Sequence, residues 1–294
     1  MRTHSYTLAE VERMHETALS RRSAEELAAV GADLGALAAA TALRNRQSGK
    51  TDLPPDEGLE AIFSPDAKVA FEVAFDNTQQ LFDRIGLELP SPEQFSGAGV
   101  DFAHLGAEFE RMEDEGLQPK IIATVHGLGA SVWRTLYENL QNDSIVNRDG
   151  TIKNGGLYID STVAENWNKL DQVPPTVLGV PYTGTNTHTA HAAWTIRLVP
   201  GTDRPTNTNV DHAVNNGTHP TITEYLTLQA NCLQERRPPI DSNTWTWLNG
   251  TFGNGQAPLG AWLSDYGQVR VYWSYVDYRY AALGSRLPVW GVEL

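Results

Sequence analysis

Apolar residues recur at helical spacing through the first third of the chain. Two capping boxes, Thr7 with Glu10 and Ser23 with Glu26, precede such runs and predict two antiparallel helices over residues 8–18 and 27–37. A third helix is predicted over residues 64–86 and a fourth over residues 102–116, each with apolar side chains three or four positions apart. Residues 1–115 are therefore predicted to form a helical N-terminal region.

The pattern changes after residue 115. The stretch "PKIIATV" predicts a buried strand, and the apolar positions between Leu128 and Leu140 predict one more helix. Beyond residue 145 most segments are short and rich in Thr, Asn, Gly and Pro, except a strand in "HAAWTIRLVPG" and a helix in "TITEYLTLQANCLQERRPP", which starts with a Thr221 and Glu224 capping box. The fold class is predicted as α+β, with residues 116–294 forming short antiparallel strands and flanking helices.

The last fifty residues alternate between apolar and polar positions. Val269, Val271 and Trp273 are predicted to face the core, so that Tyr272 faces outward. Tyrosines interleaved with small residues are typical of binding surfaces, because tyrosine offers a large amphipathic contact area with few torsions to freeze. The alternative is that these tyrosines pack under the N-terminal loops.

Charge and cysteine content narrow the function classes. The formal net charge of −14 argues against nucleic acid and anionic membranes as partners. The single cysteine, Cys232, excludes an internal disulfide and a cysteine-rich zinc site, and its apolar setting predicts a core residue. No apolar run has the length of a signal peptide or a membrane span, which favours cytoplasmic synthesis without membrane insertion.

Motifs for catalysis and metal binding are weak. "SGKT" at residues 48–51 follows Arg44 where a phosphate-binding loop needs glycine, and His212 stands where a calcium loop beginning at Asn207 needs glycine. Four histidines, His188, His191, His212 and His219, leave a metal site open as an alternative. The sequence has no nucleophile elbow or zinc-protease helix, so we expect no catalytic residue, no cofactor and no metal.

The tail "WTWLNGTFGNGQAPLGAWLSDYGQVRVYWSYVDYRYAALGSRLPVWG" resembles the variable region of diversity-generating retroelement variable proteins, which end in a C-type lectin-like (formylglycine-generating-enzyme-like) fold. In that family a reverse transcriptase copies a template repeat with errors at adenines, and adenine-poor codons for Trp, Gly, Val and Leu survive. The resemblance places a variable region at about residues 255–290. It implies a ligand-binding site at the variable positions Tyr272, Ser274, Tyr275, Asp277, Tyr278, Tyr280, Ala281 and Ala282, together with Leu259, Ala261, Leu263, Ser264, Asp265 and Tyr266.

The same resemblance implies a fixed scaffold. Trp262, Trp273, Gly284 and Arg286 belong to it, and "GSR" at residues 284–286 resembles the closing "GxR" of the fold. Catalytic relatives use a cysteine pair or a histidine triad, and true C-type lectins bind sugars through "EPN" and "WND", which are absent here. The resemblance therefore implies binding of a protein or cell-surface ligand without metal or catalysis.

Two alternatives remain open. One is a metal-dependent enzyme of the sulfatase-modifying fold that uses the four histidines named above. The other is a virion or cell-surface structural component, in which the N-terminal helices form an oligomeric stalk and the protein is a homo-oligomer.

Overall fold

The structure is a computed structural model that describes residues 65–140, 145–146, 152–153, 156–175, 177–182, 192–212, 219–253 and 255–290. The predicted helices over residues 8–18 and 27–37, the "SGKT" stretch, His188 and His191 lie outside these residues. The described part of the protein is mixed α and β, with seven helices, two sheets of short strands and a two-stranded ribbon formed by β2 (Ile145–Val146) and β3 (Ile152–Lys153). The predicted α+β class is thus confirmed at this coarse level.

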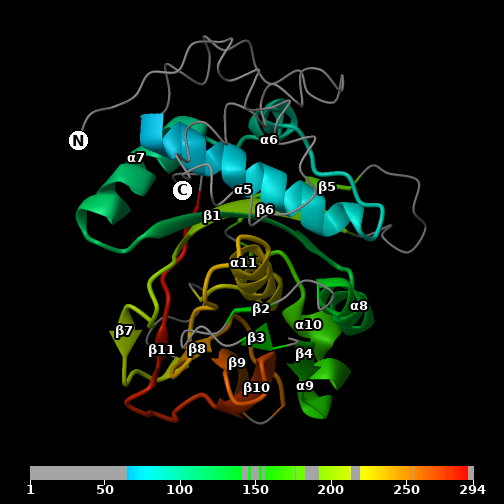
Figure 1. Cartoon of the computed structure of the whole chain (residues 1–294), viewed down its shortest axis with the longest axis vertical. Coiled ribbons are helices and arrows are strands. Elements are labelled where there is room, and N and C mark those ends of the chain that lie inside the picture. Colours follow the sequence, from blue (N-terminus) through cyan, green and yellow to red (C-terminus); the bar gives the residue numbers. More distant parts are fainter. Residues whose placement is uncertain are drawn as a thin grey trace.

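The first sheet lies across the middle of the molecule between two helical layers (Figure 1). Its strands are β1 (Pro119–His126), β6 (Ala193–Pro200) and β12 (Val289–Trp290), all antiparallel, with β5 (Val180–Pro181) also paired to β6. Adjacent residues of β6 point to opposite faces. Trp194 therefore meets Phe82 of α5 (Pro65–Asp83), with ring centroids 5.0 Å apart, whereas Arg197 pairs on the other face with Glu224 of α11 (Ile222–Gln234).

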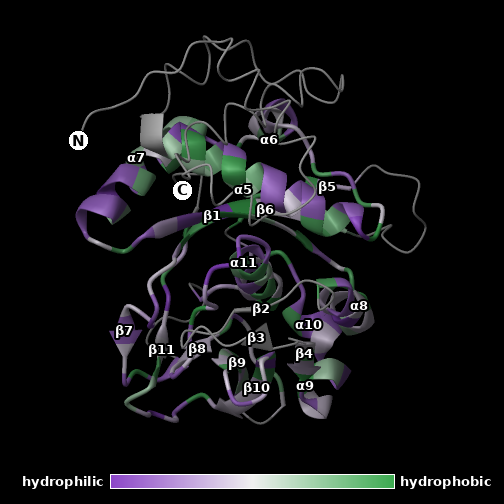
Figure 2. Ribbon diagram, viewed as in Figure 1, coloured by the Kyte–Doolittle hydropathy of each residue, from purple (hydrophilic) through white to green (hydrophobic). Residues whose placement is uncertain are grey.

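Helices α5, α6 (Pro92–Gly97) and α7 (Phe102–Asp114) share their core with this sheet. Hydrophobic and hydrophilic segments alternate along α5 and α7, as an amphipathic helix on a sheet requires (Figure 2). The boundary predicted at residue 115 stays a prediction, and the helices before it pack directly on the strands after it. No described helix is long and apolar enough to cross a membrane.

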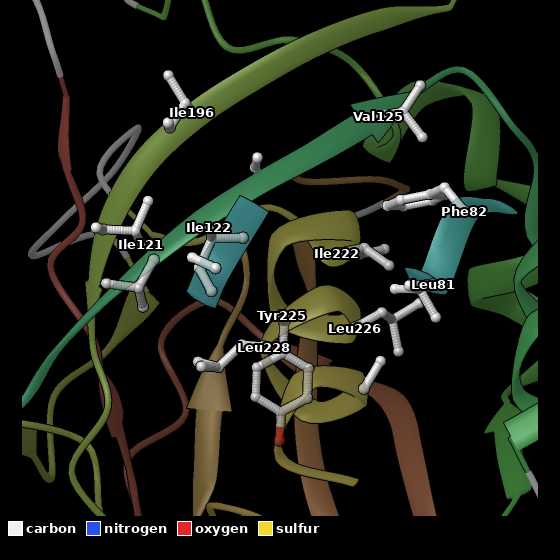
Figure 3. Close-up of a cluster of buried hydrophobic side chains, with 14 of the residues drawn as sticks. Leu81, Phe82, Ile121, Ile122, Val125, Ile196, Ile222, Tyr225, Leu226 and Leu228 are labelled. Atoms are coloured by element: carbon white, nitrogen blue, oxygen red, sulfur yellow. The ribbon is translucent and has the colours of Figure 1, made fainter. Parts of the chain in front are cut away.

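Helix α11 lies between the two sheets. Every residue from Ile222 to Leu233 is buried, and α11 packs against both β1 and α5; Leu226 lies beside Leu81 of α5 in Figure 3. On its other side Tyr225 lies against Gly260 of the second sheet, where a Cβ atom would come within 2.3 Å of the tyrosine ring. The absence of a side chain at Gly260 lets the sheet approach the helix closely.

The second sheet carries the C-terminal residues of interest. Its order is β4 (Gly156–Ile159), β10 (Gln268–Tyr275), β9 (Gln256–Leu263), β8 (Trp245–Trp247), β11 (Leu283–Ser285) and β7 (Asn207–Thr208). The β4–β10 and β8–β11 pairs are parallel and the others antiparallel. The expectation of antiparallel strands is therefore wrong for the β4–β10 and β8–β11 pairs. Both pairs join strands that lie far apart in the sequence, and no local pattern predicts such pairing.

Most predicted elements match those of the structure. Helices α5, α7, α8 (Ala130–Leu140) and α11, and strands β1, β6 and β10, lie where the apolar patterns predicted them, and the Thr221 and Glu224 capping box is present. Cys232 is buried, as predicted. Three short helices were missed: α6, α9 (Ser161–Glu165) and α10 (Trp167–Leu170), which are too short to show a helical period.

Candidate ligand-binding surface

The two faces of β10 have different surroundings. Val269 and Val271 are fully buried on the inner face, and Trp273 is half-buried against the same core. On the opposite face Tyr272 pairs across the strand with Leu259, so it points away from Val269 and Val271 as predicted, but it is half-buried against a second hydrophobic cluster of Trp247, Ala257, Leu259 and Leu283. The alternation in the sequence thus corresponds to the two faces of a real strand.

A hollow of about 480 Å³ lies on this outer face. Its lining residues come from β8, β9, β10, β11 and the segment between β10 and β11. Six of them were predicted as ligand-binding: Leu259, Leu263, Tyr272, Ser274, Tyr278 and Tyr280. The other four are Trp245, Arg270, Trp273 and Leu283.

The wall that carries Tyr278 and Tyr280 is the segment 276–282, here called the aromatic loop. Its backbone is fastened at both ends: Val276 N–H donates to the Gly255 carbonyl at 2.9 Å, and the Ala282 carbonyl accepts from Trp245 N–H at 2.7 Å. In its middle Arg279 forms an exposed ion pair with Asp211, 2.5 Å apart. These contacts restrict the backbone of the loop in the free protein, and such restriction lowers the entropy that a loop loses on binding.

Four exposed tyrosines lie in or beside this hollow: Tyr278 and Tyr280 line it, and Tyr158 and Tyr266 contact its Arg270. Six large hydrophobic side chains are exposed in the described residues, and five of them are tyrosines of β4, β10, the β9–β10 turn or the aromatic loop. Their exposed fractions run from 38% for Tyr158 to 60% for Tyr266. Together with Tyr272 they form what we call the tyrosine surface: Tyr158, Tyr266, Tyr272, Tyr275, Tyr278 and Tyr280.

Three of these tyrosines surround Arg270. Its guanidinium carbon lies 4.0 Å from the ring centre of Tyr266, 5.0 Å from that of Tyr158 and 6.0 Å from that of Tyr272. Arg270 Nη1 also donates to the Tyr272 hydroxyl at 3.0 Å. A hydrogen bond with Tyr272 raises the pKa of Tyr158. The arginine is thus fixed by cation–π and hydrogen-bonding contacts at the edge of the hollow.

The remaining predicted positions do not line the hollow and fall into three groups. Tyr275, Asp277, Ala281, Asp265 and Tyr266 are exposed, and Ser264 and Ala282 are half-buried. Ala261 is fully buried, so its expected place on the surface is wrong. Its methyl group lies opposite the longer Arg270 and between Leu259 and Leu263 on the same face, which leaves it no access to solvent.

Three of the four predicted scaffold residues, Trp262, Gly284 and Arg286, are buried and belong to what we call the frame, whereas Trp273 is half-buried and also lines the hollow. Trp262 and Arg286 are fully buried, and Arg286 Nη2 lies 2.7 Å from Asp241 Oδ1. The same guanidinium donates to the Pro200 carbonyl at 2.8 Å, which ties β11 to the first sheet. At Gly284 a Cβ atom would lie 2.2 Å from the Asn207 carbonyl oxygen, so only glycine allows β7 to pair there.

Two of the four candidate metal-ligand histidines are described, and both are buried and hydrogen-bonded within the frame. His212 and His219 stack with ring centroids 4.5 Å apart, and each Nε2 is hydrogen-bonded to a backbone carbonyl, of Leu248 and His212 respectively. His219 Nδ1 also bonds Ser285 Oγ at 2.9 Å. Burial lowers the pKa of His212 and lowers that of His219 to about 4.

Within the described ranges, no group of three or more His, Cys, Asp or Glu side chains is placed to hold a metal ion. His126 and Asp171 form a second buried pair, 3.6 Å apart, and His126 bonds Thr195 and Thr223 on neighbouring elements. Neither pair opens into the hollow.

Besides Trp273, a predicted scaffold residue, sequence reasoning did not assign four residues of this site to ligand binding: Arg270, Trp245, Tyr158 and Leu283. Arg270 stands on the same outward face as Tyr272 and Ser274, and the alternation of β10 could have identified it. Trp245 is the first residue of the C-terminal tail, but its three-residue strand is too short to show an alternation of apolar and polar positions. Tyr158 is brought in by the parallel pairing of β4 with β10, and no local signal predicts that pairing.

In comparisons with known proteins, no family model, no curated protein and no solved structure matches this sequence significantly.

Proposed function

We propose that the protein binds a protein ligand through the tyrosine surface, and that the part of this surface within residues 255–290 is the diversified region of a retroelement variable protein with a lectin-like fold. One observation carries the proposal. Four of the six exposed large hydrophobic side chains of the described residues belong to one hollow or touch it: Tyr278 and Tyr280 line it, and Tyr158 and Tyr266 lie over its Arg270. Contiguous exposed apolar patches on soluble proteins commonly mark interaction sites.

The composition of the surface supports a protein ligand. Tyrosine supplies broad contact area, and the serine and alanine residues between the tyrosines supply adaptable contacts at low entropic cost. The aromatic loop is fastened by backbone hydrogen bonds whose donors and acceptors do not depend on side-chain identity. Exchange of its exposed side chains should therefore leave the backbone in place, as a diversified site requires.

A display experiment tests this proposal. One library randomises Tyr272, Ser274, Tyr275, Tyr278 and Tyr280, and a matched library randomises five exposed positions of α7: Ala103, Ala107, Glu110, Arg111 and Asp114. Both are displayed on phage and selected against several unrelated purified proteins. We expect micromolar or tighter binders to several targets from the first library alone, because only its positions surround a preorganised hollow.

Two results would count against the proposal. Equal yields from the two libraries would mean that the tyrosine surface has no special capacity for binding. A first library whose members mostly fail to fold would mean that these positions belong to the frame.

A further inference from the structure

Arg270 lacks an anionic partner among the described residues. Arg197, Arg286, Arg111, Arg237 and Arg279 each pair with a carboxylate. Arg270 has only neutral contacts: the Tyr272 hydroxyl, the Gln268 side-chain oxygen at 3.4 Å and the three tyrosine rings. Its Nε is buried without a hydrogen-bond acceptor. Arg134, Arg204 and Arg236 also form no ion pair with a described carboxylate, but Arg270 alone among these four lines the hollow.

The position of this cation matters because it lines the hollow. A partner that covers the hollow removes water from the guanidinium, and a cation that loses water without gaining a counter-charge is costly to bury. The aromatic lining alone would also suit a cationic side chain. Arg270 argues against that choice, since like charges would then meet in a partly desolvated site.

We propose that the hollow takes a carboxylate-bearing side chain of a protein partner, with Arg270 binding the carboxylate and the aromatic walls covering the apolar group beside it. This inference rests on the proposed function and specifies the chemistry of its partner. Guanidinium and carboxylate groups form paired, charge-assisted hydrogen bonds, and the rings of Tyr158 and Tyr266 hold the guanidinium plane for that contact.

The overall charge limits what kind of acidic partner fits. A long acidic segment would be repelled by a protein with a net charge of −14. A single carboxylate with an apolar neighbour meets Arg270 at close range, where the short-range contact outweighs the screened repulsion. The partner is therefore one Asp or Glu side chain, or the terminal carboxylate of a polypeptide, next to an apolar or aromatic group.

Three matched small molecules test this inference on the full-length protein. They are 3-phenylpropanoate, 3-phenylpropanamide and 3-phenylpropylamine, which share a ring and chain length and differ in charge. Binding is measured by chemical-shift titration in NMR spectra of the protein. We expect the carboxylate to bind about tenfold tighter than the amide, as a charge-assisted hydrogen bond provides, and the amine to bind most weakly.

Four variants test which residues cause the preference for the carboxylate. Arg270→Gln should bring the carboxylate to the affinity of the amide, and Arg270→Lys should keep part of the preference because it keeps the charge. Arg111→Gln is the matched control, since it removes one positive charge from α7, at the opposite end of the molecule in Figure 1, and should change nothing. Tyr278→Ser should weaken all three molecules about equally, because it removes wall area from the hollow.

The inference is overturned if the amide or the amine binds as tightly as the carboxylate, if Arg270→Gln keeps the preference, or if none of the three molecules binds at millimolar concentration. Failure of the proposed function looks different. It would appear as equal yields from the two display libraries, whatever the charge preference of the hollow.

Discussion

At the scale of single residues, the frame depends on charges that are buried and paired. Arg286 and Asp241 are both fully buried, and Thr244 and Thr246 donate to the same carboxylate at 3.0 and 2.7 Å. Glu224 shows the same physics: burial raises its pKa, but the Arg197 guanidinium outweighs burial and keeps that pKa below the usual value. Removing one member of such a pair leaves the other as an uncompensated charge.

Replacement of Arg286 by methionine should therefore be strongly destabilising. We expect Arg286→Met to lower the free energy of unfolding by about 3–5 kcal/mol, because Asp241 stays buried without its cation. Urea denaturation followed by circular dichroism measures the loss. Arg111→Met breaks an exposed pair with Glu108 and should cost less than about 1 kcal/mol. Equal losses in the two variants would contradict the structural role of Arg286.

At the scale of elements, helix α11 packs against the sheet that carries the tyrosine surface. It is buried on all sides because the first sheet covers one flank and β9 the other. Thr124 and Thr227 bond at 2.6 Å on the first flank, and Tyr225 lies against Gly260 on the second. The position of β9, and with it the floor of the hollow, is thus set by the closeness of its approach to the helix.

An alanine at Gly260 tests this contact. Its Cβ atom would lie 2.3 Å from the ring of Tyr225, whose hydroxyl is fixed by a 2.7 Å bond from Gln229. We expect Gly260→Ala to lower the free energy of unfolding by about 1–3 kcal/mol in urea denaturation, as overpacking does.

Gly97→Ala is the control for that substitution. Gly97 ends α6, and nothing lies within 4 Å of the position of an added Cβ atom. We expect its effect to stay within about 1 kcal/mol in either direction. If Gly260→Ala were as stable as the parent protein, β9 and α11 would be free to separate, and the close contact between them would not set the floor of the hollow.

At the scale of the whole molecule, the sequence predicted what depends on local periodicity and missed what depends on distant pairing. The long helices, β1, β6 and the two faces of β10 followed from apolar spacing. The parallel approach of β4, which brings Tyr158 to Arg270, did not, because a four-residue strand carries little pattern. The burial of Ala261 also depends on neighbours across the sheet rather than on its own segment.

The arrangement of the whole molecule also separates the tyrosine surface from the frame. Trp262, Val269 and Val271 face α11 and the core, and the residues that alternate with Val269 and Val271 face the hollow. A change at an exposed position such as Tyr278 or Tyr280 should therefore alter the ligand contacts with little effect on the free energy of folding, whereas Leu259 and Tyr272 pack in a second hydrophobic cluster and should tolerate less change. This separation is the physical condition under which a gene can vary its binding site without losing its fold.

The central claim, that the tyrosine surface is a diversified binding site, is tested most directly by sequencing natural copies of this gene and counting the differences at each codon. We predict that differences concentrate at Tyr272, Ser274, Tyr275, Tyr278 and Tyr280, arise at adenines of a downstream repeat, and spare the codons of Val269 and Val271. Differences spread evenly along the gene, or concentrated in the buried frame, would contradict the claim.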